Sequence, residues 1–167
     1  MMKMLIHILL LKLSFSSVAN DQVLKFVEDN CSTNSVDTLL VVKIITHESK
    51  AYYKGKPQPW PWTLNVNGKG YWFDSYQEAL IKANSALKNK VSKLGIGLGQ
   101  IEWKFHKHRF DGGLAQALKP KENIKVVCSI LNEGRKAGIE NSFELAAYYH
   151  RPIRDQIAFD YAEKVFK

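Results

Sequence analysis

The residue with the clearest chemical potential in this sequence is Glu48, near the end of an apolar run over residues 39–49. Val41, Ile44 and Ile45 precede it at helical spacing, so a helix would place the acid on their apolar face. Desolvation raises the pKa of a carboxyl group at the edge of a core. An acid still protonated near neutral pH suits general-acid cleavage of a glycosidic bond. The alternative is that Glu48 ends a buried helix and simply reaches solvent.

Two other patterns raise the question of a metal or phosphate site. His106 and His108 are spaced as a ligand pair, but nothing nearby completes a set of three or four ligands. Exposed histidines on a basic turn explain them better. Gly95, Gly97 and Gly99 alternate, but they match no phosphate-loop spacing and have no parallel βαβ context. We expect no metal and no cofactor, and we interpret the glycines as a close backbone approach to a ligand or another segment.

The length and charge of the chain restrict its class. Its 167 residues are enough for one domain with a core of its own. Lysine and arginine number 24 against 16 acidic residues, which gives a net charge of +8. The basic residues are scattered, so the charge suits nucleic acid, phospholipid or cell wall without choosing among them. DNA binding would rest on charge alone and would weaken steeply with salt.

The N-terminus has the pattern of a secretory signal. Lys3 precedes a short apolar stretch over 5–11, and Ser17-Val18-Ala19 resembles a cleavage site. We predict a signal peptide over residues 1–19 and a mature domain over 20–167, periplasmic or secreted. The apolar stretch is too short for a stable transmembrane anchor, and export argues against a nucleic-acid partner. The alternative is a first helix that stays on the domain.

The sequence contains two cysteines, Cys31 and Cys128. In an exported protein such a pair could form a disulfide, but two buried thiols are nearly as compatible with the sequence. Separation along the chain gives no distance in space, so the pairing stays open.

Helical periodicity and capping residues predict a mainly α (α+β) single domain. Asn34 or Ser35 is a good N-cap for the Glu48 helix. Ser75 and Glu78 form a capping box that opens another helix, whose apolar stripe reaches Leu94. The remaining helices are predicted over 21–30, 103–106, 120–135, 143–149 and 153–166.

A small β-hairpin is predicted within an excursion over about 57–73. Asn67 and Gly68 separate two short strand-like runs, which is a strong hairpin signal. The stretch is rich in aromatic residues, which could line a saccharide groove or could simply anchor the hairpin. Both interpretations remain open. The aromatic residues are Tyr52, Tyr53, Trp60, Trp62, Tyr71, Trp72 and Phe73.

Three motifs follow one another along the chain: Glu48-Ser49 at the end of an apolar helix, Gly97-Leu98-Gly99-Gln100-Ile101, and Ala146-Ala147-Tyr148-Tyr149-His150-Arg151-Pro152. Together they resemble the lytic transglycosylases with a goose-type-lysozyme-like catalytic domain. The Pro-Trp-Pro-Trp stretch and Asn123-Ile124 resemble members that accompany conjugative transfer systems and integrating mobile elements. The resemblance covers residues 36–153 and implies a lysozyme-like single domain.

The resemblance implies cleavage of the MurNAc–GlcNAc β-1,4 bond of peptidoglycan, with formation of 1,6-anhydroMurNAc. Glu48 would protonate the leaving oxygen and then act as base on the C6 hydroxyl. No second carboxylate is required if the substrate's N-acetyl group assists, an exception to the two-carboxylate pattern; Asp74 and Glu102 are the nearest second acids. The implied partners are glycan strands and proteins of a conjugation or secretion apparatus. The alternatives are a lysozyme-type hydrolase and a non-catalytic wall-binding assembly module.

The resemblance also assigns roles residue by residue. Ser49 matches a residue that supports the acid, and Tyr149 matches a tyrosine that holds the catalytic carboxyl group. Three departures from the family pattern are Gly99 in place of methionine, Arg151 in place of a small residue, and a long segment before the glycine motif. The remaining matched positions are Gly97, Leu98 and Gln100 in the groove motif, and His150 where many members have asparagine.

Overall fold

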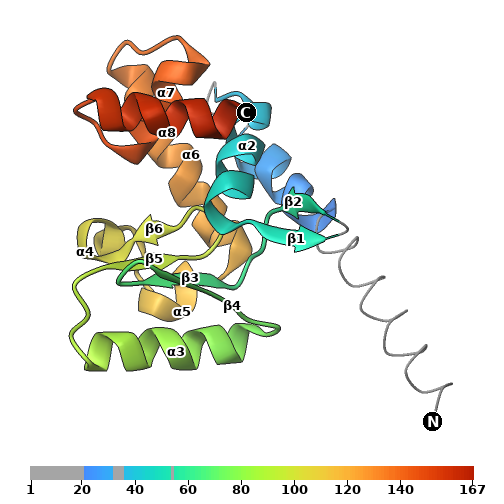
Figure 1. The fold of residues 1–167 in the computed structure, drawn as a ribbon, viewed down its shortest axis with the longest axis vertical. Helices are drawn as coiled ribbons and strands as arrows, with labels where there is room; N and C mark the ends of the chain where they lie inside the picture. Colours follow the sequence, from blue (N-terminus) through green and yellow to red (C-terminus); the bar gives the residue numbers. More distant parts are fainter. Residues whose placement is uncertain (1–20, 32–35, 54) are drawn as a thin grey trace, which may run out of the picture.

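The computed structural model describes residues 21–31, 36–53 and 55–167. The predicted signal peptide over 1–19 lies outside these residues. A long central helix, α6, runs between a group of helices and a small sheet that is covered on one face by α3 (Figure 1). This arrangement confirms the predicted mainly α (α+β) domain. The helices named are α2 (Thr38–Ser49), α3 (Tyr76–Lys88), α6 (Pro120–Lys136), α7 (Ser142–His150) and α8 (Gln156–Phe166).

The main sheet is antiparallel, with strand order β4-β3-β5-β6. Asn67 and Gly68 join the first two of its strands with positive φ angles of 52° and 88°, which confirms the predicted Asn-Gly hairpin. Strands β5 and β6 were not predicted, because they are short and flank the glycine motif. The strands are β3 (Thr63–Val66), β4 (Lys69–Trp72), β5 (Leu94–Ile96) and β6 (Ile101–Glu102).

A second, two-stranded hairpin directly follows α2 and was also not predicted. It pairs β1 (Ala51–Tyr53) with β2 (Lys56–Gln58). Pro57 in β2 argues against a strand from sequence, but proline is tolerated where a strand has a free edge.

Several helix boundaries differ from the prediction. The N-cap of α2 is Asp37, whose carboxylate accepts from the Leu39 amide at 2.9 Å; the predicted caps Asn34 and Ser35 lie outside the described residues. Helix α3 ends at Lys88, and Leu94, which was predicted as the last residue of its apolar stripe, begins strand β5 instead. Helix α8 begins at Gln156 rather than at residue 153, because Asp155 caps it.

The core lies where α6 contacts both parts of the molecule. Pro120 starts α6, where its missing N–H costs nothing, and one face of the helix is fully buried. Cys128 on this face forms a disulfide with Cys31, at a Cα–Cα distance of 5.4 Å, and so fixes the helix over 21–31 to α6. The elements between β6 and α6 are α4 (Trp103–His106), the 3-10 helix η2 (Lys107–Arg109) and α5 (Gly113–Ala117).

Within the part of the chain that the structure describes, no helix combines the length and apolar character needed to cross a membrane.

We predict that reduction of the Cys31–Cys128 disulfide lowers the free energy of unfolding by about 2–4 kcal/mol, because it frees a loop of 97 residues in the unfolded chain. Urea unfolding with and without reductant would measure the loss. A Cys31→Ala, Cys128→Ala variant is the control and should not respond to reductant. Equal stability of the oxidised and reduced wild type would contradict the prediction.

Candidate active site

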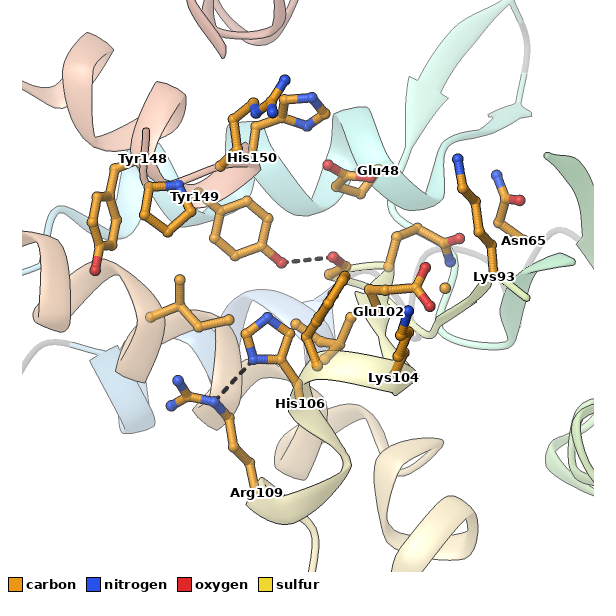
Figure 2. A pocket seen from close by; sticks show the side chains of 18 of the residues that line it. Glu48, Asn65, Lys93, Glu102, Lys104, His106, Arg109, Tyr148, Tyr149 and His150 are labelled. Carbon is orange, nitrogen blue, oxygen red and sulfur yellow. Dashed lines mark hydrogen bonds between the residues drawn. The ribbon is translucent and has the colours of Figure 1, made fainter. Parts of the chain in front are cut away.

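The carboxyl group of Glu48 faces a cleft of about 1040 Å³ between the two parts of the molecule. One wall comes from the end of α2 and the end of α7, and the opposite wall from β5, β6 and α4. Figure 2 shows Glu48 on the first wall, with Glu102, Lys104 and His106 on the opposite one. Three predicted site residues besides Glu48 also line the cleft: Gln100, Tyr149 and His150.

Glu48 combines access to the cleft with a poorly solvated carboxyl group. Val41, Ile44 and Ile45 on the same helical face are fully buried, as the spacing predicts. Burial raises the pKa of Glu48 to about 7, although the neighbouring Tyr161 hydroxyl and the charge of Lys50 act in the opposite direction. The acid is therefore partly protonated at neutral pH and can donate a proton to a bound ligand.

Tyr161, from α8, is the tyrosine that acts directly on the acid. Its hydroxyl is buried and forms no hydrogen bond among the described residues. It nevertheless lies close enough to Glu48 to lower the pKa of that carboxyl group. The ring of His150 stacks on Tyr161 at 4.5 Å, and His47 meets its edge at 5.3 Å. These two rings hold the phenol in place beside the acid.

Tyr149 has a different role from the one that the resemblance assigns. Its hydroxyl donates to the Gly99 carbonyl at 2.6 Å instead of bonding to Glu48 (Figure 2). A Cβ at Gly99 would lie 2.6 Å from this hydroxyl. The glycine that replaces the expected methionine therefore allows Tyr149 to reach the loop.

The glycine loop is fixed by a buried amide on α6. Asn123 accepts from the Gly99 amide at 2.8 Å and donates to the Ile96 carbonyl at 2.9 Å and the Ala117 carbonyl at 3.0 Å. A Cβ at Gly97 would lie 2.6 Å from the Asn123 side chain. The predicted close backbone approach is thus an approach to α6.

Gln100 lies in this loop with a positive φ of 45°. Its side-chain nitrogen donates to the Gly97 carbonyl at 2.8 Å and the Thr63 carbonyl at 3.2 Å. These bonds fix the amide plane, and Oε1 has no donor among the described residues. Gln100 can therefore offer an oriented acceptor to a ligand in the cleft. The other two matched residues of the loop, Gly97 and Leu98, are buried and do not line the cleft.

Ser49 is fully buried and does not line the cleft. Its hydroxyl donates to the Ile45 carbonyl at 2.7 Å and accepts from the Trp60 amide at 3.0 Å, while its carbonyl accepts from the Trp72 indole at 3.2 Å. Ser49 thus supports Glu48 through the backbone, by fixing the end of α2 to the hairpin.

The aromatic stretch anchors the hairpin. Besides the bond from Trp72, the indole of Trp60 donates to the Phe73 carbonyl at 2.8 Å. None of the described aromatic side chains of this stretch lines the cleft. This favours the interpretation that the aromatic residues anchor the hairpin over the interpretation that they line a saccharide groove.

Neither of the other candidate acids is coupled to Glu48. Asp74 is exposed and lies outside the cleft lining. Glu102 lines the cleft, but its Oε1 accepts from the Leu94 amide at 3.0 Å, and it is not among the groups that shift the pKa of Glu48. The described residues therefore provide one acid of raised pKa rather than a coupled carboxylate pair.

His106 and His108, which were interpreted from the sequence as exposed histidines on a basic turn, lie in different surroundings. His106 lines the cleft, whereas His108 is exposed outside it. No group of three or more histidine, cysteine, aspartate or glutamate side chains that could hold a metal ion occurs in residues 21–31, 36–53 and 55–167.

Sequence reasoning missed Tyr161 and the polar residues of the opposite wall. From the sequence, Tyr161 was placed only within the last predicted helix, over 153–166. A tyrosine on an apolar stripe must still find a polar partner for its hydroxyl, and this signal could have identified it. No comparable signal joined the residue before β5 with residues of β6, α4, η2 and α6 into one wall. These residues are Lys93, Glu102, Lys104, Arg109 and Glu133.

No protein-family model, curated protein or solved structure matches this chain. An account of its function therefore depends on the geometry of the cleft and on the motif resemblance.

We predict that Glu48→Gln stabilises the protein in a pH-dependent way. An acid whose pKa is raised from 4.5 to about 7 on folding destabilises the native state as pH rises through this range. The variant should therefore match the wild type at pH 4 and exceed it above pH 7 by about 1–3 kcal/mol. Urea unfolding from pH 4 to 8 would measure the difference. A constant difference across this range would show that burial does not raise the pKa of Glu48.

Proposed function

We propose that this protein is a peptidoglycan lytic transglycosylase with a lysozyme-like domain, which cleaves the MurNAc–GlcNAc β-1,4 bond. The observation that carries the proposal is a single glutamic acid, Glu48, that opens into a large cleft with its pKa raised to about 7. The order of the three motifs and their meeting around this cleft give further support. The location of the enzyme in the periplasm or outside the cell, where it opens the wall for a conjugation or secretion apparatus, rests on the sequence alone.

The reaction needs one group that first gives and then takes a proton. Protonated Glu48 donates to the glycosidic oxygen, the C1–O bond breaks, and the GlcNAc end leaves. The C6 hydroxyl of the same MurNAc then attacks C1 and forms the C1–O6 bond, while its proton returns to Glu48. No water is consumed, and the substrate's own N-acetyl group can stabilise the positive centre, so a second carboxylate is unnecessary.

The cleft residues have matching roles in this proposal. The carbonyl oxygen of Gln100, oriented by its two hydrogen bonds, accepts from a sugar hydroxyl. Tyr161 stabilises the charged form of Glu48 after the first proton transfer, because its neighbouring hydroxyl lowers the pKa of the carboxyl group. Tyr149 and Asn123 keep the glycine loop in position.

We expect the chain over residues 20–167 to release anhydro-muropeptides from purified peptidoglycan, and Glu48→Gln to release none. Mass spectrometry of the digests measures both. The matched control is Glu78→Gln, which changes an exposed acid on α3 far from the cleft lining and should leave activity intact. Reducing-end products would assign a lysozyme-type hydrolase. Binding to the wall without any product from the wild type would instead favour a non-catalytic module.

We expect Tyr161→Phe to shift the pH dependence of cleavage. Loss of the phenol hydroxyl removes a group that lowers the pKa of Glu48, so this pKa should rise further above about 7. The alkaline limb of kcat/KM should then move to higher pH. Tyr76→Phe is the control, since its hydroxyl donates to the Ala115 carbonyl outside the cleft lining. An unchanged limb in Tyr161→Phe would exclude direct action of Tyr161 on the acid.

A further inference from the structure

The wall of the cleft opposite Glu48 contains a rigid ion pair. Arg109 donates from Nη1 and Nη2 to the two carboxylate oxygens of Glu133, at 2.6 and 2.9 Å, and Nη1 also reaches Ser129 Oγ at 3.3 Å. Such a bidentate pair fixes the plane of the guanidinium group and largely cancels its charge. Arg109 is therefore an oriented but nearly neutralised donor within the cleft lining.

This ion pair determines the protonation of His106. A further donor of Arg109, Nε, bonds to His106 Nδ1 at 3.1 Å. Arginine can only donate, so Nδ1 must carry the lone pair and the imidazole proton must lie on Nε2. Burial lowers the pKa of His106, and the charges of Arg109 and His108 lower it further, against opposing effects of Glu133 and Glu102. The ring is thus neutral, with one fixed N–H donor.

The donor of His106 is directed into the cleft. Figure 2 shows the second ring nitrogen pointing away from Arg109, toward the interior of the pocket. Nε2 has no hydrogen-bond acceptor among the described residues. His106 is also not among the groups that shift the pKa of Glu48, so it is a binding donor rather than a partner of the acid.

We propose that His106 Nε2–H is a substrate-specificity contact that donates to the acetamido carbonyl oxygen of a sugar bound beside α4. A neutral donor whose neighbouring positive charge is cancelled suits a neutral acceptor better than a carboxylate. The acetamido oxygen only accepts, and N-acetylated sugars present one on every ring. Arg109 and Glu133 are the positioning residues of this contact. The inference rests on the proposed function, since it assumes a glycan in the cleft.

Two substitutions at one position separate a binding role from a structural one. Asparagine can place its oxygen near the position of Nδ1 and keep the bond from Arg109, but it has no group at the position of Nε2. Glutamine can place an N–H near Nε2. If His106 donates to the substrate, His106→Gln should bind the glycan more tightly than His106→Asn. If His106 has only a structural role, His106→Asn should bind it more tightly. The matched control is His108→Ala, which removes an exposed histidine from outside the cleft lining.

The test is calorimetric titration of tetra-N-acetylchitotetraose into Glu48→Gln protein that carries each substitution. We expect His106→Asn to weaken binding about three- to tenfold, the range for one lost hydrogen bond. His106→Gln should stay within about twofold of the parent, and His108→Ala should be unchanged. Cellotetraose, which lacks acetamido groups, should bind all variants with equal affinity.

Three results would overturn the inference. The first is equal affinity of the parent, His106→Asn and His106→Gln for tetra-N-acetylchitotetraose. The second is tighter binding of this ligand by His106→Asn than by His106→Gln. The third is a loss of cellotetraose affinity in His106→Asn as large as its loss of chitotetraose affinity. Release of anhydro products by the wild type separates this inference from the proposed function. If the wild type cleaves and any of the three results is found, the proposed function stands and only the role of His106 is rejected. Absence of both cleavage and parent binding would reject the proposed function and this inference together.

Discussion

The arrangement depends on one constraint, which is to keep the carboxyl group of Glu48 poorly solvated while leaving it open to a cleft. The apolar face of α2 removes water from one side, and the packing of α8 removes it from another. The resulting rise of the pKa to about 7 is a free-energy penalty that the fold must carry. Such a penalty at a cleft is characteristic of a site where function, not stability, determines the residue.

The rest of the structure makes the surroundings of this acid rigid. Ser49 fixes the end of α2 to the hairpin, Asn123 fixes the glycine loop to α6, and Tyr149 bonds to the same loop from α7. These are hydrogen bonds between buried groups that would be costly to leave unpaired. The loop can therefore present Gln100 in one orientation, although it contains three glycines.

The charge of the cleft differs from what the net charge of +8 suggests. Arg109 is paired with Glu133, and Arg151 is paired with Asp155 at 3.1 Å. Lys93 and Lys104 form no ion pair among the described residues and lie on the same side of the cleft as Glu102 (Figure 2). In the proposed function, these two lysines can attract the anionic substituents of a glycan strand.

The sequence by itself determined the local features. The spacing of Val41, Ile44, Ile45 and Glu48 identified the buried face that carries the acid, and Asn67-Gly68 identified the hairpin, because periodicity and turn chemistry act over a few residues. Only the tertiary structure decided which groups meet. It paired Cys31 with Cys128, placed Tyr161 beside Glu48 while the Tyr149 hydroxyl bonds to the glycine loop, and gave His106 a fixed tautomer through Arg109 and Glu133. These contacts join residues far apart in the chain, and their geometry depends on how α6, α7 and α8 pack, which no local pattern records.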